Sequence, residues 1–329
     1  METESTADLC FPHLSNISCR KPVSSWPELV LLRVVLLSIS LLTVTLNLLI
    51  IISVSHFRRL HTPTNVLLLS LAVSDFLVGL LLMPGEILLT TTCWSLGDVS
   101  CSLYFFMLFT ITCASIGHMV LISVDRYVAI CYPLHYPSRV TDKRVKMCVC
   151  LYWLCSLLYG GLTVKDDLAQ PGRYSSCYGE CVIMFDYITG TVDLVVSFIA
   201  PITTIIVLYM RVFVVAASQA RVMRSNFITV TLQQSGTVTV RKSELKAART
   251  LGVLTVVFLL CFCPYYCVSL AGNNISNSSA VYLAYYLFYF NSCVNPVIYA
   301  MFYPWFRKAV KLIVTLHILQ PGSSEANIL

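Results

Sequence analysis

The sequence predicts an all-α membrane protein, a bundle of seven transmembrane helices followed by a short amphipathic eighth helix. Of its 329 residues, 57% are hydrophobic and only 12% are charged, whereas about a quarter of the residues of a soluble protein are charged. The mean hydropathy is +0.78. Seven apolar segments provide the roughly 20 residues that a helix needs to cross a bilayer, at about 29–55, 64–90, 99–131, 147–164, 187–213, 249–271 and 279–303.

These elements follow one another in three parts of the chain. Residues 1–28 form a polar tail without the apolar core of a cleavable signal peptide, so the first span is expected to direct the chain to the membrane. Residues 29–303 hold the seven spans, of which the fourth is the shortest, and a polar turn at 271–279 divides the last two. In residues 304–329, aromatic and basic side chains close to the seventh span fit an amphipathic helix on the inner membrane face.

The basic residues predict the orientation of the bundle. Lys and Arg gather in the short cytoplasmic loops of membrane proteins. If the N-terminus is extracellular, most of the 22 basic residues lie inside. Three glycosylation sequons, at Asn16, Asn274 and Asn277, all fall outside in the same arrangement. The net charge of +6 is therefore interpreted as a topology signal, and no nucleic-acid partner is expected.

Several of the 15 cysteines face the oxidising outer compartment. Cys101 opens the third span at its outer end, and Cys181 lies in the outer loop between the fourth and fifth spans. A bridge between these two would pin that loop over the bundle. Cys177, in the same loop, is available for a second bridge with Cys10 or Cys19 of the N-terminal tail, and the sequence leaves the choice open. Cysteines inside the apolar runs are interpreted as packing residues.

Three motifs in order along the chain point to a family. Asp125-Arg126-Tyr127 ends the third span, Phe262-Cys263-Pro264 interrupts the sixth, and Asn295-Pro296-Val297-Ile298-Tyr299 lies in the seventh. With them the chain resembles the rhodopsin-like G protein-coupled receptors over all seven spans. The run 291–306 is similar to the seventh-helix fingerprint of the trace amine-associated receptors, the vertebrate olfactory amine sensors.

An acid in the second span marks a buried polar cluster. Asp75 lies in an otherwise uncharged helix, where an acid is costly unless it faces the interior and finds partners. By the resemblance its partners would be Ser115, Asn291, Ser292 and Asn295, whose hydroxyl and amide oxygens suit a Na⁺ ion. Two interpretations stay open, a sodium-linked site of the inactive state and a purely structural network.

The resemblance also implies an activation switch at the inner end of the third span. Arg126 would be restrained by Asp125 and would contact the G protein when the inner helix ends separate. A snorkelling arginine at the membrane surface is the simpler interpretation. Pro264 removes a helix hydrogen bond and allows the inner half of the sixth span to swing. The implied switch residues are Asp125, Arg126, Tyr127, Ile116, Pro201, Phe258, Tyr209, Pro264, Asn295, Pro296 and Tyr299.

The expected ligand site departs from that of other amine receptors. Those receptors hold the ammonium on an Asp about five helical turns before the arginine of the third span, and Leu108 stands there in this chain. Asp193 supplies an acid in the outer half of the fifth span, as in a branch of fish trace amine-associated receptors that lack the usual one. A ligand ammonium would stabilise this carboxylate; alternatively, a hydroxyl such as that of Thr112 or Tyr266 pairs with it internally.

The other pocket walls are carried over by position. Aromatic rings attract a cation, although rings in a spanning helix are more often packing residues. Phe262 replaces the usual Trp two residues before Pro264, which removes an indole N–H donor. Glu86, near the outer mouth, is expected to be solvated or paired with Lys165, and alternatively to anchor the second ammonium of a diamine. The expected lining is Leu108, Phe109, Thr112, Asp193, Ser197, Phe262, Tyr265, Tyr266, Tyr289 and Glu86.

The resemblance implies that the protein is a plasma-membrane receptor for a small amine and not an enzyme. Its implied partners are a heterotrimeric G protein of the stimulatory class, which raises cAMP, an arrestin and a receptor kinase, and no cofactor beyond an allosteric Na⁺. The sequence lacks the filter loops of a channel and the paired half-repeats of a transporter. Two alternatives stay open, a receptor of the same class for a non-amine ligand with Asp193 structural, and a small-solute transporter.

Overall fold

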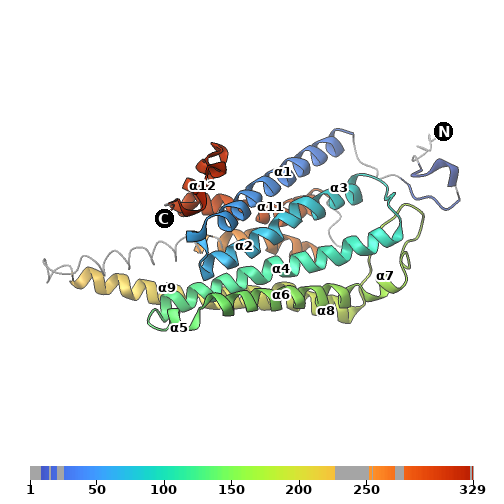
Figure 1. Cartoon of the computed structure of the whole chain (residues 1–329). Coiled ribbons are helices and arrows are strands. Elements are labelled where there is room, and N and C mark those ends of the chain that lie inside the picture. The colour runs from blue at the N-terminus through green and yellow to red at the C-terminus, as the bar shows by residue number, and fades with distance from the viewer. Residues whose placement is uncertain are drawn as a thin grey trace.

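Long apolar helices make up most of the computed structural model, which describes residues 9–14, 16–20, 26–226, 252–253, 255–270, 278–326 and 328. The helices lie side by side along one common direction, with the N-terminal segment at one end of the bundle and α12 at the other (Figure 1). This arrangement confirms the predicted bundle of transmembrane helices. Asn274 and Asn277, and most of the loop between the fifth and sixth spans, lie outside the described residues.

Each of the seven predicted spans corresponds to a helix in the described residues, and the fifth continues to Asn226, beyond its predicted end at 213. The second and fifth spans are each interrupted by a π-helical turn, and the sixth is described only in its later part, Thr255–Leu270. The spans are α1 Trp26–His56; α2 Pro63–Leu77 with η3 Val78–Leu82 and α3 Met83–Thr91; α4 Asp98–Cys131; α6 Asp142–Thr163; α8 Tyr187–Leu194 with η4 Val195–Ile199 and α9 Ala200–Asn226; Thr255–Leu270; and α11 Ser278–Phe302.

Shorter helices lie in the connections and at the two ends of the chain. On the inner side, α12 buries Trp305, Phe306 and Ala309 and exposes Arg307 and Lys308, which confirms the predicted amphipathic helix after the seventh span. The short helices are η1 Pro12–Leu14, η2 Arg58–Leu60, α5 Tyr136–Arg139, α7 Lys165–Ala169, α12 Pro304–Val314, η6 His317–Leu319 and η7 Ser323–Glu325.

The fourth span begins earlier than its apolar run predicts. Helix α6 starts at Asp142, ahead of the predicted start at 147. An acid in the first turn interacts favourably with the helix dipole, and the Asp142 carboxylate lies 2.7 Å from the Lys146 ammonium one turn later. The charged first turn therefore extends the helix beyond the hydrocarbon layer, where hydropathy alone does not detect it.

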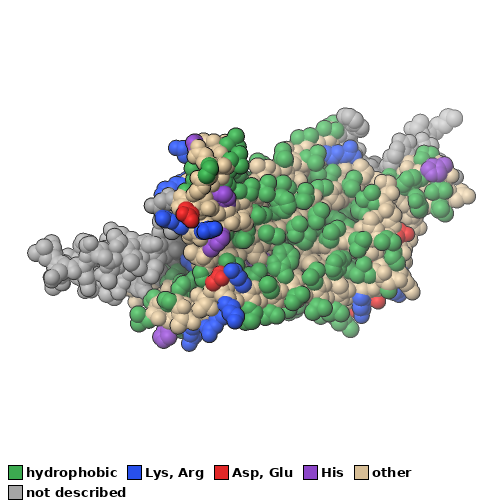
Figure 2. Space-filling view, in the orientation of Figure 1, with side chains coloured by type: hydrophobic (Ala, Val, Ile, Leu, Met, Phe, Trp, Pro, Cys, Tyr) green, Lys and Arg blue, Asp and Glu red, His purple; other side chains and the backbone are tan. Residues whose placement is uncertain are grey.

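The surface of the bundle is divided between an apolar middle and charged ends. Figure 2 shows hydrophobic side chains over most of the visible flank, with Lys and Arg gathered mainly at the end that carries α5 and α12. Leu41, Leu158 and Val207 are exposed on the outside of spanning helices. A large exposed apolar surface of this kind fits contact with lipid tails.

Three disulfides tie the N-terminal segment and the outer loop to the bundle. Cys101 is bonded to Cys181, and of the two partners open to Cys177 the structure pairs it with Cys19. The remaining tail cysteine, Cys10, is bonded to Cys93, which follows α3. The sequence analysis did not assign Cys93 to any bridge, although its place after the second span put it on the oxidising side.

Glycines allow α4 and α6 to pack closely. A Cβ atom at Gly160 would lie 2.2 Å from Thr110 Oγ1 and 3.1 Å from the backbone oxygen of Phe106, both in α4. A Cβ atom at Gly117 of α4 would lie 1.8 Å from the ring of Tyr152 in α6. Small residues at such contacts let helix backbones approach each other within a membrane.

The close contact at Gly160 predicts a stability difference between two neighbouring glycines. Gly160→Ala should lower the free energy of unfolding by about 1–3 kcal/mol, because the added methyl overpacks the interface. At Gly161 a Cβ atom would lie no closer than 3.9 Å to its neighbour, so Gly161→Ala should be neutral or stabilising. Thermal unfolding of both purified variants in detergent measures this. Equal melting temperatures would contradict the described packing.

Candidate functional site

A cavity of about 410 Å³ opens at the end of the bundle that carries the disulfides. The second, third, fifth, sixth and seventh spans and the outer loop supply its walls. Its described lining is Glu86, Leu89, Thr90, Phe105, Leu108, Phe109, Thr112, Cys181, Val182, Ile183, Phe185, Asp193, Ser197, Tyr265, Tyr266, Tyr285, Phe288 and Tyr289.

Most of the lining residues expected from the sequence meet in this cavity, and Phe262 does not. Phe262 is buried below the cavity, with its ring 4.5 Å from Phe258 and 5.0 Å from Phe288 between centroids. Leu108 lines the cavity wall, as expected. Phe262 is not among the described lining residues, and its ring packs against Phe288, which does line the cavity.

Asp193 is half-buried in the cavity wall, at the end of α8. Its Oδ1 accepts a hydrogen bond from Tyr159 of α6 and another of 3.1 Å from Ser197 Oγ. The internal partners are thus Tyr159 and Ser197, and not Thr112 or Tyr266 as the sequence suggested. Both bonds use Oδ1, and neither uses Oδ2. Because η4 begins two residues after Asp193, Ser197 lies in a π-helical turn, a feature often found at functional sites.

Glu86 is buried at the opposite side of the cavity, with only 7% of its surface exposed. Its Oε2 accepts hydrogen bonds from Tyr104 (3.2 Å) and Tyr289 (3.0 Å). The expectation that Glu86 is solvated or paired with Lys165 is wrong, since Lys165 is exposed in α7. The two tyrosines, on α4 and α11, stabilise the carboxyl group away from water and connect three spans at this point.

Aromatic rings join the two acids across the wall. The Tyr265 ring lies 5.2 Å from Tyr266, 5.5 Å from Tyr285 and 4.8 Å from Phe288 between centroids. Tyr265 lines the same cavity as Asp193 and Glu86. This ring cluster gives the cavity faces that attract cations.

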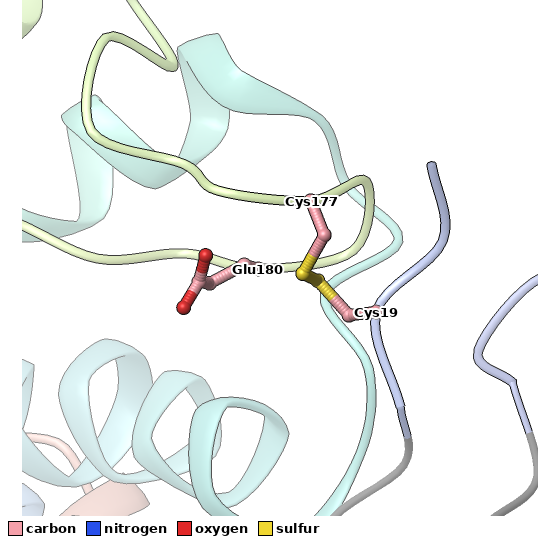
Figure 3. Close-up of side chains that lie close together, drawn as sticks. All are labelled: Cys19, Cys177 and Glu180. Atoms are coloured by element: carbon pink, nitrogen blue, oxygen red, sulfur yellow. A yellow bond between two sulfur atoms is a disulfide. The ribbon is translucent and has the colours of Figure 1, made fainter. Parts of the chain in front are cut away.

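A second hollow of about 370 Å³ lies above the first, beneath the N-terminal segment. Leu89, Cys181 and Val182 line both spaces. Figure 3 shows Glu180 beside the Cys19–Cys177 bridge. Their ligand atoms lie within 4.8 Å of one another, but both sulfurs are used in the disulfide. Thiolate binding of a metal is therefore excluded at this group while the bridge is intact.

In the middle of the bundle, Asp75 is fully buried and ties three spans together. Its Oδ1 accepts hydrogen bonds from Ser115 (3.0 Å) and Ser292 (2.9 Å), and its Oδ2 accepts one from the Asn295 amide (2.8 Å). The side-chain amide of Asn291, the residue before Ser292, is buried and has no hydrogen-bond partner among the described residues. The carboxylate, the two hydroxyls and the unpartnered Asn291 oxygen are the ligand type that a hard cation such as Na⁺ takes, so these residues fit the implied ion.

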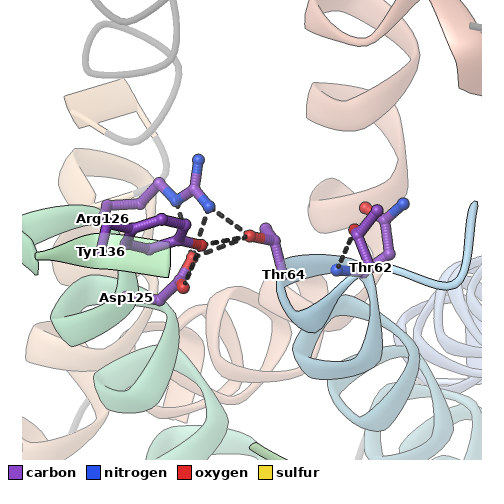
Figure 4. Close-up of polar contacts among 6 residues, drawn as sticks. Thr62, Thr64, Asp125, Arg126 and Tyr136 are labelled. Carbon is purple, nitrogen blue, oxygen red and sulfur yellow. Dashed lines mark hydrogen bonds and ion pairs between the residues drawn. The ribbon is translucent and has the colours of Figure 1, made fainter. Parts of the chain in front are cut away.

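At the inner end of α4, Arg126 is held by its neighbours. Its Nε donates a hydrogen bond of 2.9 Å to Asp125 Oδ2, and its guanidinium also donates to the Thr64 hydroxyl (Figure 4). Thr64 and Tyr136 donate in turn to the same carboxylate, at 3.1 and 2.8 Å. Burial raises the pKa of the Tyr136 hydroxyl, which keeps its proton available for Asp125. This network restrains Arg126 more firmly than snorkelling alone.

The other residues of the expected switch lie along the core below the cavity. Ile116, Phe258 and Tyr299 are almost completely buried, and Pro201 lies in the first turn of α9. Tyr209 is hydrogen-bonded to Thr255 and Ser123 rather than to Arg126, and the Tyr299 hydroxyl has no partner among the described residues. Tyr127 lies in the last turns of α4, Pro264 in the sixth span, and Asn295 and Pro296 in α11.

Besides cavity-lining residues such as Tyr285 and Phe288, sequence reasoning missed five contributors: Tyr104 and Tyr159, which bond to the acids of the cavity, Thr64 and Tyr136 at the inner end, and Cys93 in the outer bridge. The four polar ones are hydroxyl residues within or beside apolar spans, where a buried hydroxyl needs a partner. The sequence therefore indicates that these hydroxyls form hydrogen bonds, but it does not identify their partners.

The comparisons with known proteins agree along the whole chain. The description "7 transmembrane receptor (rhodopsin family)" matches residues 46–299. Trace amine-associated receptor 13c of Danio rerio is 36% identical over 98% of this chain and 96% of its own length. Trace amine-associated receptor 7f of Mus musculus is 36% identical, and receptor 7h of Rattus norvegicus is 37% identical, each over 92% of its own length.

The Asp75 cluster predicts that sodium stabilises the protein. NaCl should raise the melting temperature of the purified protein above its value in KCl at equal ionic strength, because an ion bound only by the folded state adds stability. Asp75→Asn removes the charge and should abolish the difference. If the variant keeps the full NaCl effect, or if the parent shows none, the cluster is a structural network without an ion.

Proposed function

The chain belongs to the rhodopsin family of seven-transmembrane receptors, and within it to the trace amine-associated receptors, and we propose that it binds a small amine through Asp193. As a member of this family it is a G protein-coupled receptor of the plasma membrane, with a small ligand and a G protein as partners, and not an enzyme. The amine, its anchor and the class of G protein are the proposed parts.

The observation that supports the proposal most strongly is the position of Asp193 in the cavity wall. The acid is half-buried there, and Oδ2 takes neither of the hydrogen bonds from Tyr159 and Ser197. Across the cavity Leu108 offers only apolar surface. A ligand ammonium at Oδ2 gains a charge-assisted hydrogen bond. Its cationic end therefore points toward α8, and its apolar body toward the third, sixth and seventh spans.

The proposed signal leaves through the inner network. Release of Arg126 from Asp125 and Thr64 exposes a cation to a heterotrimeric G protein. The stimulatory class, the rise of cAMP, and contacts with an arrestin and a receptor kinase are proposed from the family resemblance. An extracellular, glycosylated N-terminal segment and an olfactory role belong to the same proposal, and exposed Asn16 suits the sugar.

One alternative retains support from the structure. Tyr159 and Ser197 already provide Asp193 with two hydrogen bonds, so the acid would also suit a receptor for a non-amine ligand in which Asp193 is structural. The alternative of a small-solute transporter has no such support, because the chain belongs to a receptor family.

The amine proposal predicts a selective loss of potency in Asp193→Asn. The amide keeps an oxygen for Tyr159 and Ser197 but removes the charge, so the potency of amine agonists should fall about 10- to 100-fold, as for a lost hydrogen bond to a charged group. Guanine-nucleotide exchange and cAMP in cells exposed to a panel of amines measure the effect. Unchanged potency of every active amine would show that Asp193 does not hold the ammonium, and a parent protein that responds to no amine would favour the non-amine alternative.

The inner network predicts a rise in basal activity in Thr64→Val. This substitution removes one hydrogen bond to Arg126 and one to Asp125, each contributing about 1 kcal/mol, so basal guanine-nucleotide exchange should rise about fivefold or more. Thr45→Val is the matched control, because the exposed Thr45 hydroxyl bonds only to Leu41 of its own helix. A basal rate equal to that of the control variant would show that Thr64 does not restrain the switch.

A further inference from the structure

Glu86 is a buried acid that the proposed amine contact at Asp193 does not use. It lines the same cavity as Asp193, from the second span rather than the fifth. A carboxyl group with 7% of its surface exposed, at membrane depth, is retained only at a considerable cost in free energy. An acid in such a place marks a functional site when no internal cation explains it.

No internal cation explains it among the residues that the structure describes. The described ion pairs join Arg58 to Glu325, Arg126 to Asp125 and Lys146 to Asp142, all at the inner end of the molecule. On the outer side, Arg33 donates to the side chain and backbone of Thr91. The described partners of Glu86 are two neutral tyrosine hydroxyls, which orient the group without neutralising it.

The two acids of the cavity are held in the same manner. At Asp193, two hydroxyl groups donate to Oδ1; at Glu86, two hydroxyl groups donate to Oε2. In each case the other oxygen takes neither bond. Tyr265 lines the cavity together with both acids and packs against Tyr285 and Phe288, so aromatic faces are available to a chain that runs from one acid to the other.

We propose that the cavity binds a diamine, with one ammonium at Asp193 and the other at Glu86. The aliphatic chain between them lies along the aromatic wall formed by Tyr265, Tyr285 and Phe288. A single monoamine neutralises only one of the two acids, whereas a diamine of matching length neutralises both. This inference rests on the proposed function, because it takes the Asp193 contact as given and adds the second one.

The test compares two homologous series of ligands. The probes are α,ω-diaminoalkanes from diaminopropane to diaminodecane and the n-alkylamines of the same lengths, applied to cells that express the full-length receptor. The parent protein should respond to one diamine length at least about tenfold more strongly than to the monoamine of that length, since the second charged contact adds about 1.5 kcal/mol or more.

Glu86→Gln should remove this diamine advantage, because it lowers diamine potency more than monoamine potency. Glu86→Asp keeps the charge and should retain part of the advantage. Glu180→Gln is the control for the general negative potential, because Glu180 lines the upper hollow and not the ligand cavity. Surface expression of each variant, together with its monoamine response, shows that it has folded.

Two results would overturn the inference. Equal losses of monoamine and diamine potency in Glu86→Gln would make Glu86 a structural residue, and an undiminished diamine advantage would show that it contacts no ammonium. Asp193→Asn separates this outcome from failure of the proposed function. If Asp193→Asn lowers monoamine potency while Glu86→Gln leaves the diamine advantage intact, the amine contact at Asp193 is supported and the second contact at Glu86 is refuted. If Asp193→Asn changes the potency of neither series, both contacts are refuted.

Discussion

An ionisable side chain within the hydrocarbon layer has to find its partners inside the protein, and three acids impose this constraint on the bundle. Asp75 collects three polar groups from α4 and α11. Glu86 takes two tyrosines from the same two helices, and Asp193 takes a tyrosine from α6 and a serine from η4. Each acid thus joins helices that are distant in sequence, and the hydrogen bonds that satisfy the acids also fix how the spans face one another.

The same arrangement relates the outer cavity to the inner end. A continuous set of rings runs from Tyr285 through Tyr265, Phe288 and Phe262 to Phe258, with successive centroids between 4.5 and 5.5 Å apart. Three of these rings belong to the sixth span, which also contains Pro264. A ligand that displaces Tyr265 would therefore act directly on this helix, the one that the proposed switch requires to move. Closely packed rings transmit such a displacement because a packed core has little room to absorb it.

Hydropathy and motifs predicted the spans, the amphipathic helix and most of the cavity lining, because each depends on residues close in sequence or on a family pattern. The partners of the acids could not be predicted in this way. Asp193 faces Tyr159 of another helix, and Glu86 follows a π-helical turn that changes which side of the second span faces inward. The bridge from Cys10 to Cys93 likewise depends on how the N-terminal segment folds back over the bundle. Such pairings are properties of the packed structure.

The charge preference of the cavity is the most direct test of the central claim that Asp193 holds an amine. An active monoamine and the alcohol of the same carbon skeleton are compared on the parent protein and on Asp193→Asn. The account predicts that the parent favours the amine by about tenfold or more, as for a charge-assisted hydrogen bond, and that this preference disappears in the variant. A preference for the amine that is fully retained in Asp193→Asn would contradict it.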